Sequence, residues 1–387
     1  MRWGARAVIS AVAVTAVAGC ASTTSPGAGS GPPPAAVALA ASVQTATATW
    51  AAVAMGHLAD PTNTYWEVFV RRAGAARWSL VTPTGVADVG GLVVAASPGG
   101  TAVGFLPSAK LTFSPLALTA TLGARYAPAL ITAGLASTPD ALAVATSGAL
   151  AVVDGGARVL SARTAAGPWG AATTAAALDR VIAGQACGQT TVTAAALTRA
   201  GGFLGLACTR PGVVGLVTLA TSTPTLVPVT LPRALAHLPV TVLRAVAVGG
   251  ELVALLQAGS GPGAYDVVAR VLLDPGQVSA AHPPVTVSAA VPSPQPVLGT
   301  SVGAGGTVAL LTGQAGGPGH VAVQPAGSTT WQAEPAPPAG TAVVTVTGDT
   351  LDALAVNQAD LAVSRLRDGV WGVVQRLTVP ISYGSGH

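Results

Sequence analysis

Charged residues, aromatic residues and lysine are all scarce in this sequence. Charged residues make up 8% of the 387 positions, aromatic residues make up 4%, and Lys110 is the only lysine. The arginines are scattered, and their closest groups are Arg71 with Arg72 and Arg365 with Arg367. Nucleic-acid binding needs clustered basic side chains that displace counterions. The scattered arginines therefore argue against a nucleic-acid partner, although the pI is about 9.3.

Long hydrophobic runs are also missing beyond the first twenty residues. The mean hydropathy is high, at +0.60, but Gly, Pro, Thr and Ser interrupt every later apolar stretch. A membrane-spanning helix needs roughly 20 consecutive apolar residues. The hydrophobicity is therefore spread over short segments, as expected for a sheet protein.

The residue types that bind metals stand apart from one another. No His, Cys or Asp spacing in the sequence resembles a zinc site or a calcium loop. A phosphate-binding loop is not indicated either, because the Gly-rich segments precede predicted strands and not helices. We therefore expect no metal and no cofactor. The isolated histidines are His57, His237, His282, His320 and His387.

The N-terminus has the pattern of an export signal. Arg2 and Arg6 form a positive head, and the run 7–19 that follows has no charge and ends in small residues. The segment Val17–Cys20 (Val-Ala-Gly-Cys) resembles the bacterial lipobox. The resemblance implies that residues 1–19 are a lipoprotein signal peptide and that Cys20 receives a diacylglycerol. An ordinary signal peptide containing a chance cysteine is the alternative.

This resemblance also implies where the protein works. A lipid on Cys20 would hold the chain at the extracytoplasmic face of the cell membrane, where acyl chains give firm anchoring. Residues 20–48 are predicted to be the lipidated cysteine and a flexible Ser/Gly/Pro/Ala linker. Within it the pattern does not decide whether 36–54 is a short helix or the first strand. The richness in Ala, Gly, Pro and Arg suggests a GC-rich, actinobacterial genome.

Two further cysteines, Cys187 and Cys208, remain in the exported part. Cysteines of exported proteins are commonly paired. The segment between them reads as two strands around a turn at 199–202, which would bring the two residues onto neighbouring strands. We predict a Cys187–Cys208 disulfide, with two buried free thiols as the alternative.

The remainder of the chain predicts an all-β fold. Short Val, Ala, Leu and Thr runs alternate with Gly, Pro, Asp and Ser turns, and no long stretch has a helical apolar stripe. Four tryptophans each follow a glycine-containing turn, and the last two are about 40 residues apart, the length of a four-stranded propeller blade. These are Trp78, Trp169, Trp331 and Trp371.

We therefore predict that residues 49–383 form a β-propeller of about seven four-stranded blades. The blades are expected near 50–83, 84–128, 129–178, 179–235, 236–290, 291–338 and 339–383. The tryptophans should lie on outer strands and fill the wide gap between blades. The ring is expected to close by pairing 370–380 with 50–55 or 65–70. Two β-sandwiches are the alternative fold.

The tryptophan hairpins resemble degenerate Asp-box hairpins of sialidase-type propellers. The best match is Ser364–Trp371, in which Asp368 and Gly369 are displaced from the Asp-box positions, and the other hairpins lack the Asp. The resemblance covers four short segments and supports a propeller-like blade more than membership of that family.

No grouping of side chains in the sequence indicates a reaction. Tyr65 and Glu67 fall on one strand face, which predicts an outer-strand pair. A glycosidase needs two carboxylates about 5–9.5 Å apart, and the sequence cannot show whether any of its acids converge. The acids considered are Asp140, Asp154, Asp266, Asp349 and Asp352. We expect a non-enzymatic binding or scaffold propeller with a protein or glycan partner at the cell envelope. The alternative is an exported, sialidase-like glycan hydrolase.

Overall fold

The computed structural model describes residues 39–379, except 59–63, 84–90, 99, 106–115, 120–126, 129–137, 165–166, 200, 220–222 and 274–282. The described residues belong to one compact unit, Pro32–His387. The predicted signal peptide, Cys20 and the linker up to residue 38 lie outside the described residues.

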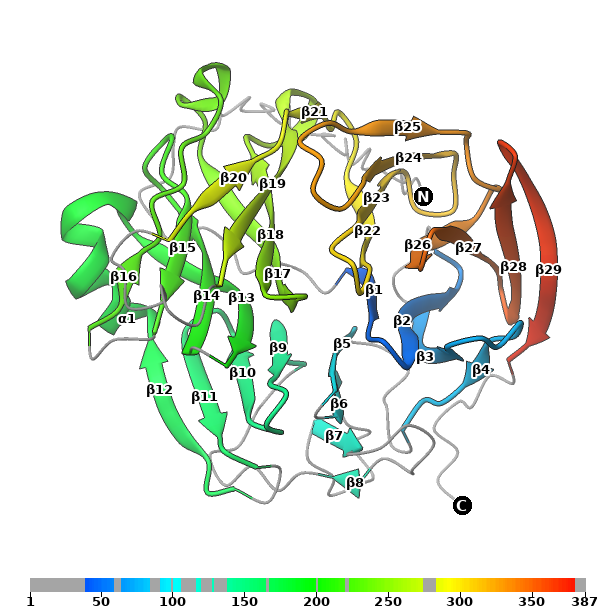
Figure 1. Ribbon diagram of the computed structural model, residues 1–387, viewed down its shortest axis with the longest axis horizontal. Coiled ribbons are helices and arrows are strands. Elements are labelled where there is room, and N and C mark those ends of the chain that lie inside the picture. The colour runs from blue at the N-terminus through cyan, green and yellow to red at the C-terminus, as the bar shows by residue number, and fades with distance from the viewer. Residues whose placement is uncertain are drawn as a thin grey trace, which may run out of the picture. The chain divides into compact units, whose positions relative to one another are not determined.

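The described strands form seven four-stranded antiparallel units, which we number as blades 1 to 7 in chain order (Figure 1). Blade 1 contains β1 (Ala40–Gln44), β2 (Ala48–Gly56), β3 (Thr64–Arg72) and β4 (Ser79–Leu80). Blade 2 contains β5 (Leu92–Ser97), β6 (Gly100–Phe105), β7 (Leu116–Thr119) and β8 (Ala127–Pro128). Blade 3 contains β9 (Ala141–Val144), β10 (Leu150–Asp154), β11 (Arg158–Ala162) and β12 (Gly170–Thr174). Blade 4 contains β13 (Thr190–Thr198), β14 (Gly201–Cys208), β15 (Gly215–Thr218) and β16 (Thr225–Leu226).

The last three blades follow the same plan. Blade 5 contains β17 (Val240–Val248), β18 (Glu251–Ala258), β19 (Tyr265–Leu272) and β20 (Val285–Val287), and β21 (Val291–Pro292) also pairs with β19. Blade 6 contains β22 (Val297–Val302), β23 (Val308–Gly313), β24 (Gly319–Gln324) and β25 (Gln332–Glu334). Blade 7 contains β26 (Thr341–Thr347), β27 (Thr350–Asn357), β28 (Asp360–Arg367) and β29 (Val370–Thr378).

The described helical elements are short. An α-helical turn, α1 (Ala175–Leu178), continues into the π-helical η2 (Asp179–Cys187) between blades 3 and 4. Two 3-10 turns, η3 (Arg233–Leu235) and η4 (Gly261–Gly263), lie in loops. No described helix is long and apolar enough to cross a membrane.

The fold is therefore the predicted β-propeller with seven blades. Its core consists of seven hydrophobic clusters, each made mainly by side chains from two neighbouring blades. Blade strands can be apolar on both faces because each face is covered by the next blade, which explains runs such as the buried Leu252–Leu256. Four inner strands also share an irregularity. Within the first five residues of each, the pairing with the second strand of its blade shifts by one residue; these strands are β13, β17, β22 and β26.

The predicted linker boundary at residue 48 is wrong. The inner strand β1 starts at Ala40, within the range assigned to the linker, and pairs with β2 antiparallel and with β22 parallel. Small residues of the Ala- and Thr-rich stretch fit the crowded middle of the ring, where Ala40 and Val43 are buried. The described part of this stretch, 39–54, therefore contains strands and no helix.

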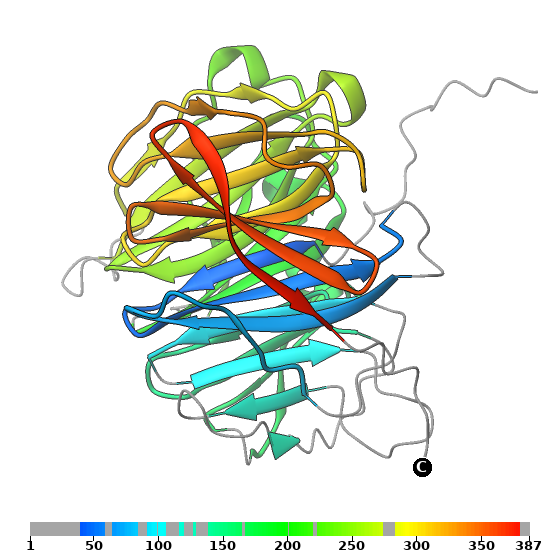
Figure 2. The ribbon, with the colours of Figure 1, turned by 90° about the vertical axis from the view of Figure 1, so that its right-hand side faces the viewer.

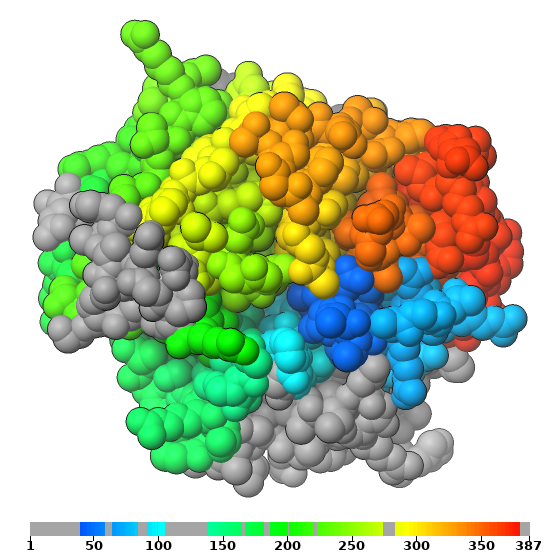
Figure 3. Space-filling model, in the orientation of Figure 1, coloured from blue at the N-terminus to red at the C-terminus, as the bar shows by residue number. Residues whose placement is uncertain are grey.

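The predicted ring closure is also wrong among the described residues. Blade 1 contains only N-terminal strands and blade 7 only C-terminal strands, and β29 pairs with β28 alone. The blue and red blades nevertheless lie in contact (Figure 3). Their side chains, together with one backbone bridge between Gly56 and Gln358, take the place of a shared strand.

The repeated tryptophans lie where the blade pattern predicted. Three donate their indole N–H to the preceding blade: Trp78 to Asp352, Trp331 to the carbonyl of Ala289, and Trp371 to the carbonyl of Pro335. Each lies just before or within the fourth strand of its blade. A large ring at this position fills the outer gap between blades, and the N–H fixes its orientation.

Candidate functional site

The middle of the ring holds a cavity of about 100 Å³. It is lined by the inner strands of blades 1 to 6, which lie nearest the middle of the ring in Figure 1, while β26 lies further out. Most of the lining is Ala, Val and Leu. The polar residues that border it are Asp140, Thr193, Arg244 and Thr300.

Among the described residues of this lining, Arg244 is the only cation. It lies on β17, and its Nη1 donates to the backbone carbonyl and the hydroxyl of Thr300 on β22, at 3.0 and 2.9 Å. Desolvation lowers its pKa to about 10, so the guanidinium stays protonated at neutral pH. No motif in the sequence predicts a role for this residue; the one local signal is a single charge within the apolar run Val240–Val248.

The acids considered from the sequence do not converge at the cavity. Only Asp140 borders it. Its Oδ2 accepts the backbone N–H of Gly156 at 2.7 Å, and burial raises its pKa, with a smaller contribution from the nearby charge of Asp154. Asp154 itself pairs with Arg158 at 2.5 Å. Both carboxylates thus stabilise the β10–β11 turn.

The remaining acids have local roles in other blades. Asp349 is exposed in the β26–β27 turn. Glu67 accepts a hydrogen bond from Thr82 on the same blade, and burial raises its pKa. Tyr65 and Glu67 both lie on β3, which pairs with β2 and β4 and is therefore not the outermost strand that was predicted for them. Asp266 is fully buried on β19, and desolvation raises its pKa to about 6.

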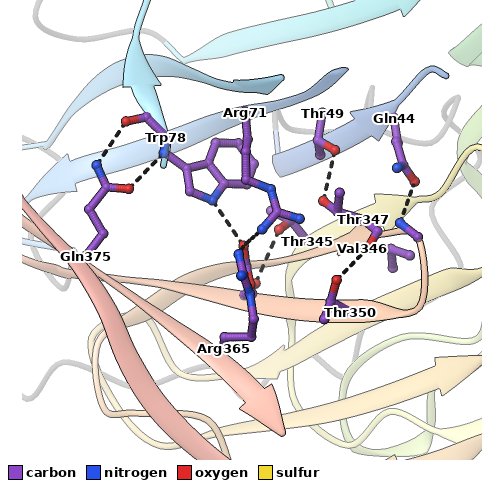
Figure 4. Close-up of polar contacts among 12 residues, drawn as sticks. Gln44, Thr49, Arg71, Trp78, Thr345, Val346, Thr347, Thr350, Arg365 and Gln375 are labelled. Atoms are coloured by element: carbon purple, nitrogen blue, oxygen red, sulfur yellow. Dashed lines mark hydrogen bonds and ion pairs between the residues drawn. The ribbon is translucent and has the colours of Figure 1, made fainter. Parts of the chain in front are cut away.

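Asp352 is the centre of a buried polar cluster between blades 1 and 7. Its partners Arg71, Trp78 and Arg365 are labelled in Figure 4. Arg71 on β3 donates to it at 2.5 Å, and Arg365 on β28 donates to both of its oxygens at 2.7 and 3.0 Å. Trp78 donates its indole N–H at 3.2 Å, and its backbone exchanges two hydrogen bonds with Gln375. Asp352 is 0% exposed and Arg71 4% exposed. The cluster joins the first and last blades.

The outer edge of blade 7 differs from that of every other blade. Its fourth strand, β29, has nine residues, whereas the described parts of the fourth strands in the other blades have two to five. Figure 2 shows this dark red strand at the front. Val370, Val373 and Val374 on it are 68%, 54% and 41% exposed. Among the described residues no strand pairs with its outer edge.

The predicted disulfide is present: Cys187 and Cys208 are bonded. Cys208 ends β14, as expected, but Cys187 ends η2 and does not lie on a strand. The bond fixes η2 to the β13–β14 hairpin. A closed loop of this length contributes on the order of 3 kcal/mol by restricting the unfolded chain.

The described residues contain no group of three or more His, Cys, Asp and Glu that could hold a metal ion. His57, His237 and His320 are on separate blades or loops. His282, His387 and the predicted lipidation site Cys20 lie outside the described residues.

Comparison with known proteins supports the fold and no more. No protein-family model and no curated protein matches the sequence. Among solved structures, the chain is similar to the GH74 enzyme of Niastella koreensis, with TM-score 0.50 and 13% identity over 86% of this chain and 53% of that chain. It is also similar to a candidate 6-phosphogluconolactonase of Bacteroides fragilis, with TM-score 0.50 and 9% identity over 87% and 96%.

A third structure, YCF48 bound to a D1 peptide, has TM-score 0.41 and 13% identity over 61% of this chain and 66% of that chain. The chain thus covers less than two thirds of the first two structures found, YCF48 and the GH74 enzyme. These proteins include enzymes and a peptide-binding protein. At such low identity the two structures with TM-score 0.50 support the propeller-like fold alone.

Proposed function

We propose that this protein is a lipid-anchored, extracytoplasmic binding or scaffold propeller. It binds a protein of the cell envelope through the free edge of β29. The observation that carries the proposal is the long outer edge of blade 7, with three exposed valines, in a molecule whose other blade edges are short. Protein sheets usually protect their edges with very short strands, charges or proline. The described fourth strands of six blades are short, whereas β29 of blade 7 is long and is interrupted by one register shift, at Val374, and one charge, Arg376.

Such an edge suits strand addition. In that mode an extended segment of a partner forms main-chain hydrogen bonds with the free edge, and exposed side chains on alternate positions supply specificity. The apolar Val373 and Val374 favour an apolar or β-branched partner strand, because cross-strand pairs of this kind stabilise a sheet. A protein partner therefore fits this surface better than a glycan.

The membrane anchor in this proposal rests on the lipobox-like segment that ends at Cys20. The Cys187–Cys208 disulfide supports an exported location independently, because disulfides persist in oxidising compartments. A lipid on Cys20, followed by the Ser/Gly/Pro-rich segment, would tether the propeller to the extracytoplasmic face of the membrane.

Hydrolysis of a glycan is the alternative function. A glycosidase places two carboxylates about 5–9.5 Å apart beside the substrate. Here Asp140 and Asp154, whose charges lie near each other, bind Gly156 and Arg158 at the β10–β11 turn. The mainly apolar lining of the central cavity likewise favours binding over acid–base chemistry.

Site-specific photocrosslinking in intact cells tests the proposal. A photoreactive amino acid at Val373 in the full-length lipoprotein should give one discrete crosslinked protein. The same group at Leu80 or Leu272, which are exposed on blades 1 and 5, should not give that product. A Val373→Lys substitution, which places a charge on the edge, should reduce crosslinking from Val370 at least fivefold. The same crosslinked product, in equal amount, from photoreactive groups at Val373, Leu80 and Leu272 would contradict a role for β29.

A further inference from the structure

The central cavity contains a cation whose hydrogen-bonding capacity is only partly used. Arg244 reaches from blade 5 toward blade 6, where Nη1 makes both of its hydrogen bonds to Thr300. In the described part of the protein, the other two guanidinium nitrogens, Nε and Nη2, make no hydrogen bond; Arg244 is half-buried and neither nitrogen is a fully buried atom, so both stay accessible from the cavity. A guanidinium has five N–H donors in a fixed planar arrangement, so its free N–H groups can bind an acceptor such as a carboxylate.

No described carboxylate neutralises Arg244. The described ion pairs involve Arg71, Arg158, Arg270 and Arg365 and leave Arg244 out. Asp140 borders the same cavity, but its carboxylate is directed to the backbone N–H of Gly156 at 2.7 Å. The cation therefore faces the cavity without a counter-ion from the described part of the protein.

An unpaired charge in apolar surroundings is costly unless a partner of opposite sign reaches it. The cavity that Arg244 borders is lined mainly by apolar residues of the inner strands, among them Val94, Leu142 and Ala194. The desolvation that lowers the pKa of Arg244 reflects the same surroundings. An anion that entered the cavity would recover this cost and gain strong, charge-assisted hydrogen bonds.

We propose that the central cavity binds a small carboxylate through Arg244. The planar carboxylate would accept from the free guanidinium nitrogens, and its short apolar substituent would contact the Ala and Val side chains of the inner strands. The cavity of about 100 Å³ offers several times the space that one water needs. It suits a short-chain acid and excludes a long acyl chain. This inference is independent of the partner proposed for β29.

Thermal unfolding at constant ionic strength tests the proposal, with sodium acetate and sodium propionate as probes and sodium chloride as the reference salt. The full-length protein should show a saturable rise in Tm of about 2–4 °C with acetate or propionate. Arg244→Met should remove this rise while Tm in chloride stays equal to or above that of the wild type, because the variant lacks the unpaired charge. Arg367→Met, which removes an exposed arginine of blade 7, should keep the full response.

Arg244→Lys gives a second, independent readout. It keeps the charge but loses the planar fork, so acetate should bind at least tenfold more weakly, as measured by calorimetric titration. If Arg244→Met does not fold, the affinity of Arg244→Lys for acetate still tests whether Arg244 binds the carboxylate. The proposal is overturned by a carboxylate response that survives in Arg244→Met or is undiminished in Arg244→Lys. It is equally overturned if the wild type does not respond, or if inorganic phosphate shifts Tm and acetate does not.

Discussion

Replacement of Asp352 by Asn is expected to lower the free energy of unfolding by about 3–5 kcal/mol, the usual cost of breaking a buried ion pair from one side. The carboxylate binds Arg71, Arg365 and Trp78 at the junction of blades 1 and 7. Without its charge, Arg71 would remain buried without a counter-ion. Chemical denaturation of both proteins at pH 7 measures the difference.

Asp349→Asn is the matched control, since Asp349 is exposed in the turn three positions earlier, and it should change stability by less than about 0.5 kcal/mol. The double variant Asp352→Asn, Arg71→Met should lose less than the sum of the two single losses, because it removes the charge that the first change leaves unpaired. A loss below about 1 kcal/mol for Asp352→Asn would show that the cluster does not hold the ring closed.

Asp266→Asn is expected to stabilise the protein at neutral pH, by on the order of 1–3 kcal/mol. Asp266 is fully buried, Gln257 donates to its Oδ1 at 3.4 Å, and its Oδ2 has no hydrogen-bond partner among the described residues. Burial without a cation raises its pKa to about 6. The ionised form therefore destabilises the folded state, and an uncharged amide of the same shape avoids this cost.

The direction of the pH dependence follows from the raised pKa. An unfolded Asp titrates near pH 4, so between about pH 4 and 6 the folded protein holds a proton that the unfolded chain has released. The contribution of this group to stability is fully retained below pH 4 and declines as the pH rises through 6. Denaturation of wild type and Asp266→Asn from pH 4 to 7 should show a difference that grows over this window. A difference independent of pH would contradict a raised pKa.

The blade plan was predictable from the sequence because it depends on local patterns. Turn residues separate the strands, and Trp78, Trp331 and Trp371 recur before or within the fourth strand, where an indole bridges two blades. The disulfide was predictable for a similar reason, since a hairpin between Cys187 and Cys208 limits where these residues can lie.

The features that depend on contacts across the ring were not predictable. Ring closure by the Arg71–Asp352–Arg365 cluster joins residues nearly three hundred positions apart, and no local period marks such a pair. The inner strand β1 was hidden because its Ala-rich sequence resembles the linker that precedes it. Arg244 was overlooked because only the closed ring shows that six inner strands surround it.

Mass spectrometry of the N-terminus of the native protein, purified from membranes, tests the central claim of a lipid-anchored propeller most directly. The expected product is a mature chain that begins at Cys20 and carries a thioether-linked diacylglycerol, with residues 1–19 removed. An unmodified Cys20, or a chain that still begins at Met1 and fractionates with the cytoplasm, would contradict it.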